Sequence, residues 1–207
     1  MKFTAFLQGL KGLLQYGTPI SATSRVTEVP YQRFTKPRKD ITQCFTELFQ
    51  GLLSEKTTEI IVYDPYAKKW SEKDNWRITD EERQNRELTM QRYTMLLESF
   101  FEMAVTEAPN CKSATIYSTF PIDKAVRRKL KLNWQTPERK RSVNFNATGY
   151  RPLHGRKFIF IEEAEKSKLI KDVLLDRGFG VFKIEDKEIT AIQQAFLTIT
   201  EWTEQKE

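Results

Sequence analysis

The residues best suited to hold a charged group lie in two short strings in the C-terminal part of the sequence. The first, residues 153 to 157, contains Arg156 and His154, the single histidine among 207 residues. The second, residues 177 to 183, begins and ends on a cation and carries two glycines. Glycines let backbone amides approach an anion, and arginine can bind phosphate through two parallel hydrogen bonds. We therefore predict a phosphate-binding site formed by His154, Arg156, Arg177 and Lys183.

Four short apolar runs, rich in β-branched residues, predict the strands that position these strings. The first run ends at Asp64-Pro65, because proline cannot donate to a sheet ladder and disfavours helix in the residue before it. The third alternates apolar with polar residues, as a strand with one face in water does. The predicted strands cover residues 58 to 64, 113 to 118, 142 to 147 and 158 to 161.

Helices are predicted wherever apolar residues recur at steps of three and four. Asp40 is a candidate N-cap for a helix that ends near Leu53, and Thr79 begins a capping box for a helix that runs to about Glu107. Pro121 suits the first turn of a basic helix. Further helices are predicted over residues 2 to 16 and 186 to 203, and an extended connector over residues 17 to 39.

Strands that alternate with helices predict an α/β fold, a layered sheet flanked by helices, with an N-terminal helical extension. Residues 1 to 55 are interpreted as this helical extension and its linker, and residues 56 to 207 as the α/β domain. Residues 163 to 176 fit either a helix or the arms of a hairpin, and their periodicity does not decide between the two.

Composition favours a folded chain with anionic partners. Hydrophobic residues make up 39% and charged residues 30% of the sequence, as in ordinary globular proteins. The net charge of +6 favours nucleic acid, phospholipid surfaces or acidic proteins, although a solvated surface of mixed charge is an equally weighted alternative. The densest basic region predicts a basic face made of Lys124, Arg127, Arg128, Lys131, Arg139, Lys140 and Arg141.

The cysteines and the N-terminus point to a reducing compartment. Cys44 and Cys111 have no CxxC spacing, so neither a zinc site nor a disulfide framework is indicated, and no metal or other cofactor is predicted. The sequence has no run of about 18 apolar residues and no leader-type start, which predicts a cytoplasmic protein.

The order of these features resembles the phospholipase D-like C-terminal domain family of MIT-domain-containing proteins. The resemblance covers about residues 58 to 203 and rests on Asp64-Pro65-Tyr66 and on the strings 153 to 157 and 177 to 183. It implies a fold like half of a phospholipase D enzyme with a degenerate catalytic set, in a family whose eukaryotic members bind anionic phospholipid. Gly155 and Gly180 stand where that family usually has acidic residues.

The histidine string argues against phosphodiester cleavage. A phospholipase D reaction needs a histidine nucleophile, a second histidine as general acid, and lysines that hold the phosphate. Counted from His154, the His-x-Lys-x4-Asp signature places Arg156 at the lysine and Ile161 at the aspartate. A second histidine could come only from a homodimer partner. We therefore predict no catalytic residue, and keep a phosphodiesterase or nuclease that uses His154 in a homodimer as a lesser alternative.

The prediction that results is a non-catalytic phospholipase D-like module that binds a phosphate-bearing polymer within a larger protein complex. Nucleic acid is favoured over membrane, because the sequence lacks a basic amphipathic helix with an aromatic apolar face. Two alternatives stay open. One is binding to anionic phospholipid membranes, and the other is a protein scaffold whose N-terminal helices hold a partner while His154 only hydrogen-bonds the backbone.

Overall fold

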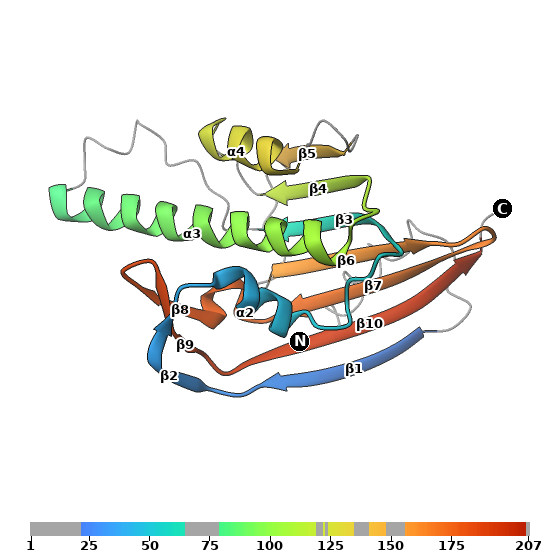
Figure 1. The fold of residues 1–207 in the computed structure, drawn as a ribbon, viewed down its shortest axis with the longest axis horizontal. Helices are drawn as coiled ribbons and strands as arrows, with labels where there is room; N and C mark the ends of the chain where they lie inside the picture. The colour runs from blue at the N-terminus through green and yellow to red at the C-terminus, as the bar shows by residue number, and fades with distance from the viewer. Residues whose placement is uncertain are drawn as a thin grey trace, which may run out of the picture.

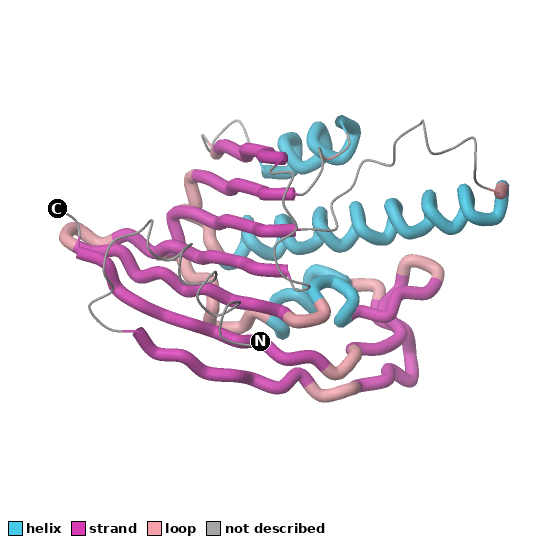
Figure 2. The backbone as a smooth tube through the Cα atoms, turned by 180° about the vertical axis from the view of Figure 1, so that it is seen from behind, coloured by secondary structure: helices cyan, strands magenta, loops and turns pink. Residues whose placement is uncertain are grey.

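The computed structural model describes residues 22–64, 79–118, 122, 124–134, 141–147 and 156–205. This part of the chain forms ten strands in two sheets, three α-helices and one short 3-10 helix (Figure 1). All three α-helices lie on one face of the larger sheet, as Figures 1 and 2 show from opposite sides.

The larger sheet has seven strands in the order β1-β10-β7-β6-β3-β4-β5. The β3–β4 and β4–β5 pairs are parallel, and the other pairs are antiparallel. Its strands are β1 (Ala22–Val29), β3 (Thr57–Asp64), β4 (Ser113–Ser118), β5 (Ser142–Ala147), β6 (Arg156–Glu163), β7 (Ser167–Leu175) and β10 (Ala195–Gln205).

The smaller sheet has the order β2-β9-β8 and is antiparallel. Its strands are β2 (Gln32–Arg38), β8 (Phe182–Glu185) and β9 (Glu188–Ile192). A tight turn joins β8 to β9 through Asp186 and Lys187, whose φ angles of 48° and 66° are the left-handed values that two-residue hairpins need. The N-terminal strands therefore complete both sheets, since β1 pairs with β10 and β2 with β9.

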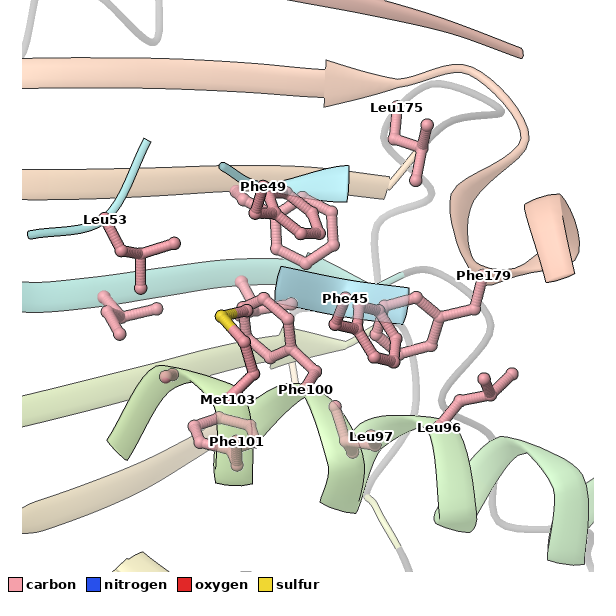
Figure 3. Packing of buried hydrophobic residues seen from close by; sticks show 14 of the residues in the cluster. Phe45, Phe49, Leu53, Leu96, Leu97, Phe100, Phe101, Met103, Leu175 and Phe179 are labelled. Atoms are coloured by element: carbon pink, nitrogen blue, oxygen red, sulfur yellow. The ribbon is translucent and has the colours of Figure 1, made fainter. Parts of the chain in front are cut away.

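The helices are α2 (Ile41–Leu48), α3 (Asp80–Glu107) and α4 (Lys124–Trp134). Asp40 caps α2 as predicted, because its carboxylate accepts a hydrogen bond of 2.8 Å from the Gln43 amide. Aromatic side chains join α2, α3 and the larger sheet in the core (Figure 3). Phe45 meets Phe100 edge to face at 5.8 Å between ring centroids, and Phe49 meets Phe158 at 4.8 Å. Each such buried ring contributes about 1.5 to 3 kcal/mol of hydrophobic stabilisation.

The predicted fold, an α/β layer flanked by helices with an N-terminal helical extension, is wrong. The structure is β-rich, with a mixed sheet of seven strands. Residues 22 to 38, expected to be a connector, form β1 and β2, and most of the expected C-terminal helix over residues 186 to 203 forms β9 and β10. The helical spacing was misleading because buried positions there alternate, at Ile189 and Ala191 and again at Ala195, Leu197 and Ile199.

The strands and the long helix that were predicted in the middle of the sequence are confirmed. The four expected strands are β3, β4, β5 and β6, and the helix expected from Thr79 to Glu107 is α3. Residues 167 to 175, left open between a helix and a hairpin, form the single strand β7, which pairs with β6. The helix expected over residues 2 to 16 lies outside the described residues.

Candidate anion-binding pocket

A pocket of about 850 Å³ opens between α3, β8 and the 3-10 helix η3 (Gly178–Val181). Its floor is apolar and includes Leu96 and Phe179, which Figure 3 shows on α3 and η3. The polar residues around it include several cations. The polar lining residues are Thr89, Arg92, Tyr93, Arg156, Arg177, Lys183, Glu185 and Gln193.

Three of the four residues predicted to bind phosphate line this one pocket, namely Arg156, Arg177 and Lys183. The sheet explains their convergence. Arg156 begins β6 opposite Leu175, the last residue of β7, and the chain then turns through Arg177 and η3 into β8. His154, the fourth predicted residue, lies outside the described part of the chain.

Arg156 is held in place by a buried ion pair. Its side chain is 2% exposed, and Nη2 donates a hydrogen bond of 2.7 Å to Oδ1 of Asp64, which is fully buried at the end of β3. The Tyr93 hydroxyl, on α3, donates to the other oxygen of the same carboxylate. Burial, and to a smaller extent the negative charge of Asp64, raises the pKa of Tyr93 well above its usual value. The hydroxyl therefore stays protonated and remains a donor.

The other two nitrogens of the Arg156 guanidinium differ from Nη2. Nε and Nη1 are buried and have no hydrogen-bond partner among the residues that the structure describes. The ring centroid of Phe179 lies only 3.5 Å from Cζ, so one face of the guanidinium is covered by an aromatic ring. A buried N–H without an acceptor costs about 1 to 3 kcal/mol, and more when it belongs to a charged group. An anion entering the pocket would relieve part of this cost.

Gly178 makes this arrangement possible. Its φ of +53° is a left-handed value that disfavours any residue with a side chain. A Cβ atom there would lie 3.2 Å from Cβ and 3.3 Å from Nη1 of Arg156. Gly180 differs, since a Cβ atom there would meet nothing within 4 Å. The first glycine of the predicted turn is thus the one that lets η3 pack against the buried guanidinium.

The rim of the pocket carries exposed charges of mainly one sign. Lys183 pairs with Glu185 at 2.9 Å, and both side chains are more than half exposed. The hydrogen bond from Lys183 and its charge lower the pKa of Glu185, and the charges of Arg33 and Arg92 lower it further. The rim carboxylate of Glu185 is therefore surrounded by cations, and a second anion would meet the same positive field.

The predicted basic face is only partly formed by the described residues. Lys124, Arg127, Arg128 and Lys131 lie on α4, whereas Arg139 and Lys140 fall outside the described residues. Arg141 is 5% exposed, donates to the Pro109 carbonyl at 2.8 Å and packs over the Trp134 ring. It therefore belongs to the core. α4 lies on the other side of α3 from η3 and β8 (Figure 1), so the basic face and the pocket are separate surfaces.

Sequence reasoning missed the partners that hold Arg156. The sequence predicts Asp64 only as the end of a strand, and it gives Tyr93, within the helix that runs to about Glu107, no role of its own. The available signal was a carboxylate that closes a strongly apolar strand, because such a group is buried and needs a cation. Arg92, on the rim, carried no signal of its own.

The described residues suggest neither a metal centre nor a reactive thiol. No group of three or more His, Cys, Asp or Glu side chains in this part of the chain is placed to hold a metal ion. Cys44 and Cys111 are both buried free thiols, and burial raises the pKa of Cys111 to about 11. None of the helices that the structure describes is long and apolar enough to cross a membrane.

Comparison with known proteins does not assign the chain to a group. No family model matches it, and no curated protein is significantly similar to it. The geometry of the pocket is therefore the basis on which a function can be argued.

Proposed function

We propose that this protein is a non-catalytic binding module whose pocket between α3, η3 and β8 receives a phosphate group of an anionic polymer, with nucleic acid as the favoured ligand. The observation that carries the proposal is Arg156. It is 2% exposed, it lines the pocket, and two of its three nitrogens have no acceptor among the described residues. Asp64 compensates one positive charge, and the additional cations Arg92, Arg177 and Lys183 that line the pocket favour an anion over a neutral ligand.

The exposed cations of the pocket support the same ligand class. Arg177 and Lys183 stand on either side of η3, and Arg92 faces them from α3. Oxygen anions are bound most strongly where buried and exposed cations combine, because burial strengthens the charge interaction and rim charges steer the ligand inwards. A cytoplasmic complex that handles nucleic acid is the setting in which we propose that the module works.

The proposed relationship to MIT-domain-containing proteins is supported by the pocket alone. Arg156 and Arg177 come from the two sequence strings that carry the resemblance, and both residues line the pocket.

The decisive experiment removes rim cations, because changing the buried Arg156 would also disturb folding. Binding of a labelled single-stranded oligonucleotide is measured by fluorescence anisotropy for wild type and for the Arg177→Ala/Lys183→Ala variant. Removal of two charge-assisted hydrogen-bond donors is expected to weaken binding about ten-fold or more. The slope of log affinity against log salt should also fall by roughly 0.7 for each phosphate that the variant no longer neutralises.

A matched control removes two exposed lysines elsewhere. The Lys112→Ala/Lys166→Ala variant has the same change in net charge, and Lys166 lies in the turn after β6, at the opposite end of that strand from Arg156. Its affinity should stay within about two-fold of wild type, as expected for exposed surface charges. Equal losses of affinity in both variants would show that net charge, and not the pocket, binds the polymer. A loss of affinity confined to a Lys124→Ala/Arg128→Ala variant would move the site to α4.

A further inference from the structure

We infer that the pocket takes a terminal phosphate monoester at the end of a nucleic-acid strand, in preference to the internal diesters of the same strand. The inference rests on the proposed function and adds the chemical form of the group that enters the pocket. Three features of the described residues carry it: the depth of Arg156, the balance of charge, and the number of acceptors that the guanidinium requires.

The depth of Arg156 favours a group that enters end-on. The guanidinium is covered by the Phe179 ring, with Cζ at 3.5 Å from its centroid, and the Tyr93 ring lies 5.6 Å away on α3. An internal diester has a sugar on both sides and could reach this depth only by bringing two chain segments in with it. A terminal phosphate has one substituent, so the remainder of the strand can stay outside along the cationic rim.

The charges around the pocket match a dianion. Among the described residues, four cations line it and two carboxylates accompany them, Glu185 on the rim and the buried Asp64 bound to Arg156. These groups leave a formal excess of two positive charges. A phosphate monoester carries about −1.5 to −2 at pH 7, because its second pKa is about 6, while a diester carries a single negative charge. The monoester therefore neutralises the pocket more completely.

The hydrogen-bonding requirement leads to the same form of phosphate. Nε and Nη1 of Arg156 lack an acceptor among the described residues but are themselves buried, whereas the donors of Arg177 and Lys183 on the rim are exposed to a ligand. A monoester brings three unesterified oxygens and a diester brings two. Since each charge-assisted hydrogen bond strengthens binding, the additional oxygen favours the terminal group.

The test compares one single-stranded oligonucleotide with a 5′-phosphate or a 5′-hydroxyl, labelled at its 3′ end, and repeats the comparison with a 3′-phosphate labelled at its 5′ end. One of the two terminal phosphates is expected to bind about ten-fold tighter than the matching hydroxyl strand near neutral pH. The preference should be lost in Arg177→Ala/Lys183→Ala and kept in Lys112→Ala/Lys166→Ala. It should also shrink as the pH is lowered from about 7.5 to about 5.5, where the monoester loses its second charge.

The outcomes separate the two proposals. Equal binding of phosphorylated and unphosphorylated strands, with binding still weakened in Arg177→Ala/Lys183→Ala, would overturn the terminal-phosphate inference and leave the proposed function standing. No binding of any strand would overturn both. Vesicles that contain phosphatidic acid, a lipid with a terminal monoester, are compared with vesicles of phosphatidylglycerol. A preference seen with the vesicles and not with the strands would overturn the assignment to nucleic acid.

Discussion

Replacing Asp64 with asparagine tests the feature on which the pocket depends. The substitution keeps the shape of the side chain and one of its two accepting oxygens, but it removes the negative charge that is 2.7 Å from Arg156 Nη2. The two side chains are 0% and 2% exposed, so water cannot replace that charge. Removing one partner of such a buried pair typically costs about 3 to 5 kcal/mol. Such a loss would nearly unfold a domain at the lower end of the usual stability range of about 5 to 15 kcal/mol.

Urea denaturation followed by circular dichroism measures this destabilisation, with and without inorganic phosphate. In the variant, a phosphate in the pocket would supply the negative charge that Asp64 no longer provides. We therefore expect phosphate to stabilise Asp64→Asn more than wild type. A ligand at about 100 times its dissociation constant adds about 2.7 kcal/mol, which is large enough to separate the two responses.

Asp172 provides the matched control. It pairs with Lys157 at 2.6 Å, but the Lys157 side chain is 34% exposed and water can compensate its charge. Burial raises the pKa of Asp172 in spite of this lysine, which indicates that its negative charge is costly in the folded state. Asp172→Asn should therefore cost no more than about 1 kcal/mol and leave the phosphate response unchanged. Similar costs for both variants, or identical phosphate responses of Asp64→Asn and wild type, would refute the reasoning.

Three further predictions concern single residues. Gly178→Ala should destabilise the protein by about 1 to 3 kcal/mol and weaken phosphate binding, because its φ is positive and a methyl group would press on the buried arginine, whereas Gly180→Ala should leave the stability unchanged. Denaturation and anisotropy measurements on both variants check this. Glu185→Gln should strengthen oligonucleotide binding about two- to five-fold, since a rim carboxylate no longer competes with the ligand for its lysine, and a weaker affinity would contradict this. Burial holds the pKa of Cys111 at about 11, above its value in the unfolded chain, so its contribution to stability is complete below about pH 9 and is lost as the pH rises towards 11. Cys111→Ala should flatten the stability profile in that range.

The elements that sequence could predict are those whose burial repeats locally. β3 is an almost continuous apolar run, and α3 follows a capping box, so each could be recognised without its neighbours. β1 could not, because its residues are nearly all exposed and carry no apolar alternation. It is a strand because β10 hydrogen-bonds to it, over a separation of 166 to 180 residues between partners. β10 itself combines buried residues at steps of two with a spacing that also fits a helix.

The candidate site likewise has a part that the sequence could predict and a part that it could not. The types and spacing of Arg156, Arg177 and Lys183 were sufficient to predict a common site, because a strand, a turn and another strand keep them close along the chain. The ion pair that orients Arg156 joins residues 92 positions apart, and only the antiparallel pairing of β3 with β6 brings them together. No local pattern reports such a pairing, so the electrostatic centre of the site required the structure.

The closure of both sheets by the first described strands has a consequence for how the protein is made. Ala22 pairs with Trp202, and Gln32 pairs with Ile192, so β1 and β2 leave the ribosome long before the strands that pair with them. Contacts so distant along the chain slow folding, and unpaired strand edges favour aggregation meanwhile. β1 and β2 contain four cations and one carboxylate. This like charge would keep the unpaired N-terminal strands of neighbouring nascent chains apart and so protect the protein from aggregation during synthesis.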